Sequence, residues 1–227
     1  KNQYVILGVT GPNEYENNVN NNFYTNYLAK WCIDYTLENI SKIEDQYGFS
    51  ARDRIETWRQ MLNSPKSISE DEKLHLVNSF FNQTKFKSDL DHWGEEDYWA
   101  TPVELLATNG GDCEDYSIAK YFTLRELGIP DEKLRITYVK ALQLNQAHMV
   151  LAYYSEPDTE PLILDNLTTD IKAGSQRHDL YPIYSFNGEG LWLSKQRGLG
   201  KRVGHSDKLN RWNELNQRML KDLQIEL

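Results

Sequence analysis

One stretch constrains this chain more than any other, the run from Thr108 to Pro130. Gly110 and Gly111 allow a sharp turn, and Asp112 is a good N-cap for a helix. Apolar residues then recur at helical spacing until a glycine and a proline stop the helix. We therefore expect Cys113 in the first turn of a largely buried helix. Unpaired backbone N–H groups and the positive end of the helix dipole favour a thiolate at that position.

Two later residues supply partners for such a thiol. His148 opens a β-rich run, 147–154, and Asp165 lies in a second apolar run, 161–167. A cysteine at a helix start, followed by a histidine and an aspartate on successive strands, is the order of nucleophile, general base and base-orienting carboxylate. The plain alternative makes Cys113 a small core residue and His148 a core histidine. An unpaired buried carboxylate is costly, so Asp165 favours the catalytic interpretation.

The residues beside the cysteine pose an electrostatic problem. Asp112, Glu114 and Asp115 place three carboxylates near a thiol that must ionise, and negative charge raises a thiol pKa. The helix start opposes this by only about 0.3–1 kcal/mol. A bound divalent cation would cancel the local charge, and carboxylate oxygens suit calcium. The alternative is that these acids cap the helix and pair with basic residues, and spacing alone favours neither.

Length and charge limit the remaining possibilities. The chain has 227 residues and a net charge of −9, with no basic block, which argues against binding a nucleic-acid backbone. No apolar run is long enough to span a membrane. The chain starts at Lys1 without a signal peptide, so we expect a processed or trimmed product. Its two cysteines suit no disulfide framework, so we expect Cys32 to be unpaired.

Helical patterns occur near both ends of the predicted core. Ser50–Asp53 reads as a capping-box variant that opens a helix ending before Pro65, and Ser69–Glu72 opens a second helix. An amphipathic helix follows from Asp207, with its apolar stripe expected in the core. Between them, the segment 89–102 is predicted to be a loop rich in tryptophan and acid.

Strand patterns begin after the cysteine helix. Residues 134–138 alternate as a half-buried strand, and 158–161 is a plausible hairpin between the His148 and Asp165 runs. Adjacent antiparallel strands would bring those two side chains within hydrogen-bond reach. Short runs at 181–184 and 190–193 are predicted to add edge strands, and 197–202 reads as a solvated basic loop.

Helices followed by a helix feeding an antiparallel sheet describe an α+β fold. Two tryptophans of the 89–102 segment, Trp93 and Trp99, either wall a substrate cleft or anchor the loop on the core. We leave both alternatives open.

Several motifs carry a resemblance from about Lys42 to the C-terminus. They are Trp93-Gly94, 97–102, 110–116, 133–135, 146–150, 164–167 and 184–188. In these motifs the chain resembles the bacterial transglutaminase-like cysteine proteinases. The resemblance implies a papain/transglutaminase-like fold, in which N-terminal helices and a catalytic helix pack on an antiparallel sheet. It also implies Cys113 as nucleophile, His148 as base and Asp165 as the third member, with the acids Asp112, Glu114 and Asp115 associated with Ca²⁺.

The resemblance further implies a particular activity. Among these proteinases the chain is similar to periplasmic, calcium-dependent ones that cut the N-terminal region of giant biofilm adhesins, at small residues such as paired alanines. The expected partners are the adhesin and the periplasmic domain of an inner-membrane cyclic-di-GMP receptor, which sequesters the protease; cleavage promotes biofilm release. We expect no nucleic-acid partner and no membrane insertion. Two alternatives are a catalytically quiet binding module and a transglutaminase-type acyltransferase with the same triad.

The first 41 residues do not fit this family. The Asn-rich segment 1–41 resembles the catalytic-loop region of maltose phosphorylase, and Glu14 matches the glutamate that acts there as general acid. Those enzymes need a whole helical barrel to build a sugar site, and the chain has no room for one, which argues against sugar phosphorolysis. We interpret 1–41 as an appended segment and 42–227 as the protease domain.

Overall fold

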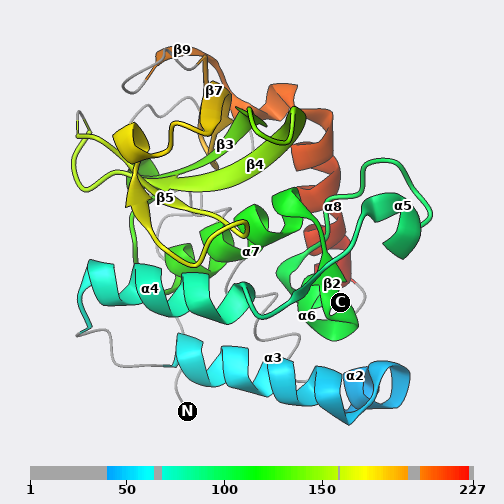
Figure 1. Cartoon of the computed structure of the whole chain (residues 1–227). Helices are drawn as coiled ribbons and strands as arrows, with labels where there is room; N and C mark the ends of the chain where they lie inside the picture. The colour runs from blue at the N-terminus through cyan, green and yellow to red at the C-terminus, as the bar shows by residue number, and fades with distance from the viewer. Residues whose placement is uncertain (1–39, 64–67, 158, 194–199, 225–227) are drawn as a thin grey trace.

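The computed structural model describes residues 40–63, 68–157, 159–193 and 200–224 (Figure 1). The appended segment predicted at 1–41, with Cys32 and Glu14, lies almost wholly outside these ranges. The helices are α2 (Ile40–Tyr47), α3 (Phe49–Leu62), α4 (Glu70–Phe81), α5 (Asp89–His92), α6 (Pro102–Thr108), α7 (Cys113–Glu126) and α8 (Asn210–Gln224), with 3-10 turns η1 (Asp131–Lys133), η2 (Gly174–Gln176) and η3 (Ser206–Lys208). The strands are β1 (Lys85–Phe86), β2 (Gly110–Gly111), β3 (Leu134–Ala141), β4 (Gln146–Tyr153), β5 (Leu162–Leu164), β6 (Lys172–Ala173), β7 (Leu180–Phe186), β8 (Leu191–Leu193) and β9 (Lys201–Gly204).

The helix α7 lies in the middle of the molecule. It contacts β3 and β4 of the sheet, and α4 and α6 contact it as well. In Figure 1 the sheet lies above α7, while α4 and then α3 lie below it. A helix enclosed in this way is buried nearly all round, and the residues from Asp115 to Arg125 are all buried, including the charged Asp115, Lys120 and Arg125. The predicted buried helix that begins at Cys113 is therefore confirmed.

A seven-stranded antiparallel sheet covers α7, with strand order β6-β5-β4-β3-β7-β8-β9. Its register pairs Val139 with His148 and Leu151 with Leu164. The predicted antiparallel pairing of the His148 and Asp165 runs is confirmed, because β4 and β5 are neighbours. Helices packed on an antiparallel sheet confirm the predicted α+β fold.

Two predictions about the later strands are wrong. The runs at 181–184 and 190–193 form β7 and β8, but β7 pairs with β3 and β8, and β8 lies between β7 and β9. The predicted solvated loop at 197–202 contributes Lys201 and Arg202 to β9. Local sequence pattern shows that a strand forms, whereas pairing partners far along the chain decide whether it lies at an edge.

The predicted helix starts have mixed outcomes. The helix start predicted at Ser69–Glu72 is confirmed by α4, and these two residues form a capping box, in which the Ser69 hydroxyl accepts from Glu72 N–H at 3.2 Å and Glu72 accepts from Ser69 N–H at 2.8 Å. The capping box predicted at Ser50–Asp53 is wrong, because α3 already begins at Phe49. The N-cap is Gly48 with φ 83°, a conformation that favours glycine and turns the chain between α2 and α3.

The 89–102 segment is more helical than predicted. It contains α5, whose N-cap Ser88 accepts from Asp91 N–H, and it ends at the start of α6. Thr101 and Glu104 form a full capping box at the start of α6. These caps fix the starts of α5 and α6, and the Ala100 N–H between them donates to Asp115 in the first turn of α7 at 2.7 Å.

An aromatic cluster anchors the C-terminal helix α8 to the core. Trp212 stacks on Phe122 of α7 with ring centroids 5.6 Å apart, and it meets Phe186 of β7 edge-on at 5.3 Å. The predicted core stripe is confirmed, because Trp212, Leu215 and Met219 are buried. No helix in the described part of the chain is long and apolar enough to cross a membrane.

We expect Trp212→Ala to lower the free energy of unfolding by about 3–5 kcal/mol, because it opens a cavity between α7, α8 and the sheet. The neighbouring Arg211 forms exposed ion pairs with Asp97 and Glu214. Its replacement by alanine should cost about 1 kcal/mol or less. Urea unfolding followed by tryptophan fluorescence and circular dichroism would compare the two, and equal losses would contradict the assignment of Trp212 to the core.

Candidate active site

A histidine and an aspartate form a buried pair at the ends of neighbouring strands. His148 Nε2 lies 2.8 Å from Asp165 Oδ1, and the two residues are 6% and 1% exposed. His148 projects from β4, and Asp165 follows the last residue of β5. The sequence prediction that brought these two residues together is confirmed by this contact. Because Nε2 faces the carboxylate, Nδ1 is the nitrogen available to a third group.

Asp165 is held by four contacts in addition to its burial. Oδ1 also accepts from Leu167 N–H at 3.0 Å, and Oδ2 accepts from Arg177 Nη2 at 2.6 Å. The Asn82 side chain donates to the Asp165 carbonyl at 2.8 Å. Burial alone would raise the pKa of Asp165, but His148, Leu167 N–H and Arg177 outweigh it and lower the pKa to about 2. The carboxylate therefore stays ionised at neutral pH.

Cys113 lies at the first position of α7 and is half-buried. Its thiol donates to Glu114 Oε2 at 2.9 Å, and the backbone N–H of Met149 lies close enough to lower the pKa of the thiol. Met149 follows His148 on β4, so the sulfur lies against the strand that carries the imidazole. The structure thus places the predicted nucleophile beside the residue that follows His148 in the chain.

The thiol is strongly disfavoured as an anion in this setting. Burial raises the pKa of Cys113 well above its ordinary value, and the nearby charges of Glu114 and Asp112 raise it further. The Met149 N–H works in the opposite direction. The expectation from the sequence that the acidic neighbours raise the pKa of this thiol is therefore confirmed for Glu114 and Asp112.

The acidic neighbours belong to a larger cluster. Three groups have ligand atoms within 4.8 Å of one another: Asp112, Cys113 and Glu114; Asp89, Asp112 and Asp115; and Asp89, Asp97 and Glu114. Asp112, Glu114 and Asp115 were expected here from the sequence, whereas Asp89 and Asp97 were not. The signal was the density of acids between 89 and 97, which the loop interpretation left without a role.

The cluster fits a cation. Asp89 Oδ1 and Asp112 Oδ1 are buried without hydrogen-bond partners, and such oxygens are costly unless a donor or metal satisfies them. Burial and the nearby charges of Glu114 and Asp97 raise the pKa of Asp89 to about 6. The pKa of Asp112 is raised by burial and by Glu114. Hard oxygen ligands with excess negative charge are what calcium binds.

Asp115 has a second function within the cluster. Its Oδ1 accepts from Ala100 N–H at 2.7 Å and its Oδ2 accepts from Asp112 N–H at 3.2 Å. It thereby caps α7 and ties the 89–102 segment to the helix start. The capping alternative holds for Asp115, whose residue exposure is 0%.

The two tryptophans of the 89–102 segment differ in burial. Trp99 is 6% exposed and stacks on Phe186 at 5.7 Å, so it anchors the segment to the core. Trp93 is half-buried and packs against Tyr98 at 4.6 Å. The anchor alternative therefore holds for Trp99, and Trp93 remains a candidate cleft residue.

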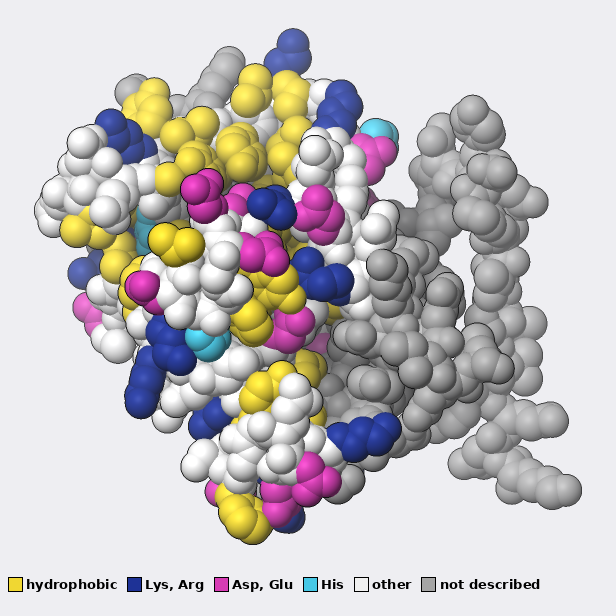
Figure 2. Space-filling view, turned by 90° about the vertical axis from the view of Figure 1, so that its right-hand side faces the viewer, with side chains coloured by type: hydrophobic (Ala, Val, Ile, Leu, Met, Phe, Trp, Pro, Cys, Tyr) yellow, Lys and Arg dark blue, Asp and Glu magenta, His cyan; other side chains and the backbone are white. Residues whose placement is uncertain are grey.

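The charge near the site is local. Figure 2 shows the face of the molecule on the α5 side, where acidic and basic side chains are interspersed among hydrophobic ones. The described side chains of this face form no broad field of one sign. A cation would therefore be attracted by the carboxylates of the acidic cluster and not by a wider negative surface on this face.

A cysteine at the start of a buried helix, beside a histidine–aspartate pair on an antiparallel sheet, defines a cysteine proteinase of papain/transglutaminase-like architecture. The chain belongs to the bacterial transglutaminase-like cysteine proteinase family, whose model matches residues 47–194. It is similar to LapG of Legionella pneumophila, with 46% identity and a TM-score of 0.70 over 80% of this chain and 96% of LapG. Similar values hold for EGTA-treated LapG (47%, 0.71) and calcium-bound LapG (46%, 0.69).

The chain is also similar to fragments of disaccharide phosphorylases. It is 49% identical to maltose phosphorylase of Bacillus subtilis over 65 residues, which are 27% of this chain and 9% of that enzyme. Kojibiose phosphorylase of Halothermothrix orenii is 35% identical over 87 residues, again 9% of the enzyme. The chain therefore spans under a tenth of the length of these curated relatives.

The acidic cluster generates a prediction about stability. A carboxyl whose pKa is raised on folding binds its proton more tightly in the folded state, so stability falls as pH rises from about 4 to about 6. At pH 7 without metal, we expect Asp89→Asn to raise the free energy of unfolding by about 1–2 kcal/mol. With calcium at 100 times its Kd, the parent protein should gain about 2.7 kcal/mol and the variant much less.

Thermal unfolding with calcium and with chelator would measure both effects. Asp91→Asn is the matched control, because Asp91 lies in the same helix but is exposed and outside the three carboxylate groups. Equal calcium stabilisation of parent and Asp89→Asn proteins would contradict the assignment of Asp89 to a metal site.

Proposed function

We propose that this protein is a calcium-dependent cysteine endopeptidase with the triad Cys113, His148 and Asp165, and that it cleaves the N-terminal region of a large surface adhesin. One observation carries the proposal: Cys113 contacts the backbone of Met149, next to a His148 imidazole that a buried Asp165 orients. Family membership supports peptide-bond hydrolysis by a cysteine.

The proposed reaction starts with proton transfer from Cys113 to His148 Nδ1. The thiolate attacks the carbonyl carbon of the scissile peptide bond, and the resulting oxyanion collapses with loss of the amine, which takes the proton from His148. Water, deprotonated by His148, then hydrolyses the thioester and regenerates the thiol. Asp165 keeps the imidazole in the tautomer that presents a basic Nδ1 to the sulfur.

The start of α7 also suits the developing oxyanion. The first N–H groups of a helix have no partner within the helix and point out of its N-terminus, beside Cys113. Fixed donors aimed at the position where negative charge develops stabilise the transition state more than the ground state. We propose the Cys113 N–H as one of these donors.

The acidic cluster is the proposed calcium site. Asp89, Asp112 and Glu114 would hold the ion, which would supply positive charge beside the thiol. Its support is the unsatisfied buried oxygens of Asp89 and Asp112 and the calcium-bound and EGTA-treated structures of the similar LapG protein. Asp115 would hold the helix start in place through its two backbone contacts.

The proposed setting rests on the family resemblance. We propose that the protein acts in the periplasm, that cleavage of the adhesin releases cells from biofilm, and that the periplasmic domain of an inner-membrane cyclic-di-GMP receptor sequesters the protease. Sequestration predicts that this receptor domain binds Cys113→Ala protein as well as the parent and inhibits the parent in proportion to occupancy. Calorimetry and a cleavage assay would test this, and binding without inhibition would contradict sequestration.

The catalytic proposal predicts cleavage of an adhesin N-terminal fragment only by protein with an intact Cys113 and with calcium present. Parent, Cys113→Ala and Cys32→Ala proteins would be compared by gel electrophoresis and mass spectrometry, each with calcium and with EGTA. Cys32→Ala is the matched control, since Cys32 is the other of the two cysteines. Cleavage by Cys113→Ala would overturn the assignment of the nucleophile, and full activity of stripped protein in EGTA would overturn the calcium dependence.

We expect Asp165→Asn to lower kcat by about 10²–10⁴-fold, because the amide favours the wrong imidazole tautomer while leaving the shape of the site intact. The same variant should bind the substrate with little change in affinity, since Asp165 is buried behind His148. Single-turnover kinetics with calcium at saturation would separate the two effects. A loss confined to KM would contradict the role of Asp165 in the chemistry.

A further inference from the structure

A third residue lies behind the His148–Asp165 pair. Arg177, which follows η2, is buried, with its side chain 5% exposed. Its Nη2 donates to Asp165 Oδ2 at 2.6 Å and to Asp179 Oδ2 at 2.8 Å, and its Nε donates to Asp179 Oδ1 at 2.9 Å. The four side chains form one connected row from imidazole to carboxylate to guanidinium to carboxylate.

We propose that Arg177 is a positioning residue for the reaction: held by Asp179, it fixes one oxygen of Asp165 so that the other stays on His148. This inference rests on the proposed function, because it concerns the same triad. It adds a residue and a role that the sequence analysis missed, since Arg177 lies in a polar loop without strand or helix periodicity.

The two oxygens of Asp165 have separate partners. Oδ1 is hydrogen-bonded to His148 and accepts from Leu167 N–H, whereas Oδ2 accepts from Arg177. A carboxylate held on one side only can rotate about its Cβ–Cγ bond, and the imidazole it orients rotates with it. A guanidinium held at two nitrogens by Asp179 is a rigid donor, so it prevents this rotation.

Arg177 also balances charge at the buried aspartate. Asp165 faces His148 of β4, and the charge of the buried Lys120 of α7 also acts on it. Lys120 donates to Asn82 Oδ1 at 2.7 Å, and Asp179 lies behind Arg177. Without Arg177 the negative charge of Asp165 would fall more fully on the imidazole and stabilise its protonated form. A protonated imidazole cannot accept the thiol proton, so loss of Arg177 moves the reaction to higher pH.

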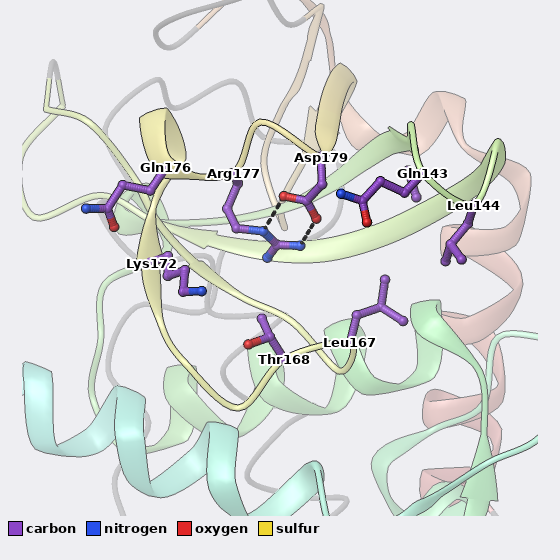
Figure 3. A pocket seen from close by; sticks show the side chains of 9 residues that line it. Gln143, Leu144, Leu167, Thr168, Lys172, Gln176, Arg177 and Asp179 are labelled. Carbon is purple, nitrogen blue, oxygen red and sulfur yellow. Dashed lines mark hydrogen bonds and ion pairs between the residues drawn. The ribbon is translucent and has the colours of Figure 1, made fainter.

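The Arg177–Asp179 pair lines the wall of a surface pocket of about 380 Å³. Figure 3 shows the Arg177 guanidinium between Asp179 on one side and the Leu167–Thr168 turn on the other. Lys172 lines the same pocket, and its ammonium pairs with Asp170 at 3.7 Å, away from Asp165. Lys172 is therefore a matched control for the loss of a cation from this pocket.

The first experiment measures the His148 imidazole directly, without using activity. Histidine NMR spectra would be recorded across a pH series in Cys113→Ala protein and in the same protein with Arg177→Met, Arg177→Lys or Lys172→Met. His148→Gln would assign the signal among the five histidines. We expect the imidazole to stay protonated to higher pH in Arg177→Met, to shift less in Arg177→Lys, and to be unchanged in Lys172→Met.

The second experiment uses the active protein with calcium at saturation. Arg177→Met should lower kcat/KM for adhesin-fragment cleavage by about 10–100-fold, the usual loss when a catalytic group is misplaced by about 1 Å. Its pH–rate profile should move to higher pH. Asp179→Asn should have the same effects in smaller measure, and Lys172→Met should match the parent.

The outcomes separate this inference from the proposed function. If folded Arg177→Met protein gives the parent's imidazole titration, the inference is overturned, whatever the activity of the chain. An activity loss with an unshifted pH profile would mean a purely structural role and would also overturn it. If the imidazole shifts but Cys113→Ala protein still cleaves the substrate, the proposed triad fails, while the effect of Arg177 on the His148–Asp165 pair stands.

Discussion

The interaction on which this structure most depends is the pairing of the Asp165 carboxylate inside the protein. A charge that is 1% exposed is tolerated only when its oxygens are fully satisfied, and both oxygens of Asp165 have partners. Those partners come from β4, from the loop after η2 and from the turn after Asp165 itself, while Asn82 holds its backbone from the end of α4. Satisfying one buried charge therefore fixes the relative positions of the sheet, α4 and the η2 loop. The geometry around His148 follows from that constraint.

The acidic cluster on the other side of Cys113 differs from the Asp165 site, because its buried carboxylate oxygens are not all satisfied. The cluster around Asp89, Asp112 and Glu114 leaves buried oxygens unsatisfied and raises the pKa of Asp89 and Asp112, which costs folding free energy in the absence of a cation. The fold tolerates this arrangement because Asp115 and the caps of α6 and α7 hold the backbone in place. A thiol that is protonated in such surroundings would respond to any cation that enters them. The carboxylates that would bind the metal thus lower the free energy of unfolding of the protein when no cation is bound.

How much of this could be read from the sequence depends on how local each signal is. The start of α7 was predictable because glycines, an N-cap and helical spacing lie within a few residues of Cys113. The His148–Asp165 contact was predictable because a short connection makes their runs antiparallel neighbours. Arg177 and Asp89 were not, since each reaches the site from a segment whose local pattern is that of a loop. The central position of β7 was missed for a different reason, because its partner β3 lies 39 to 50 residues earlier in the chain, from Ala141↔Leu180 to Ile136↔Phe186.

The His148–Asp165 pair and the acidic cluster meet at the first turn of α7. The difference between these two environments explains why a buried helix carries the cysteine. On one side the thiol faces the strand of His148, whose charge environment is balanced by Asp165, Arg177 and Asp179. On the other side it faces the carboxylates of Glu114 and Asp112, and in the same cluster Asp97 pairs with Arg211. A nucleophile on a mobile loop would average over both environments. Fixing Cys113 at the start of a helix enclosed by the sheet and α4 holds the thiol in both environments at once, so that burial, Glu114 and Asp112 raise its pKa while the Met149 N–H acts in the opposite direction.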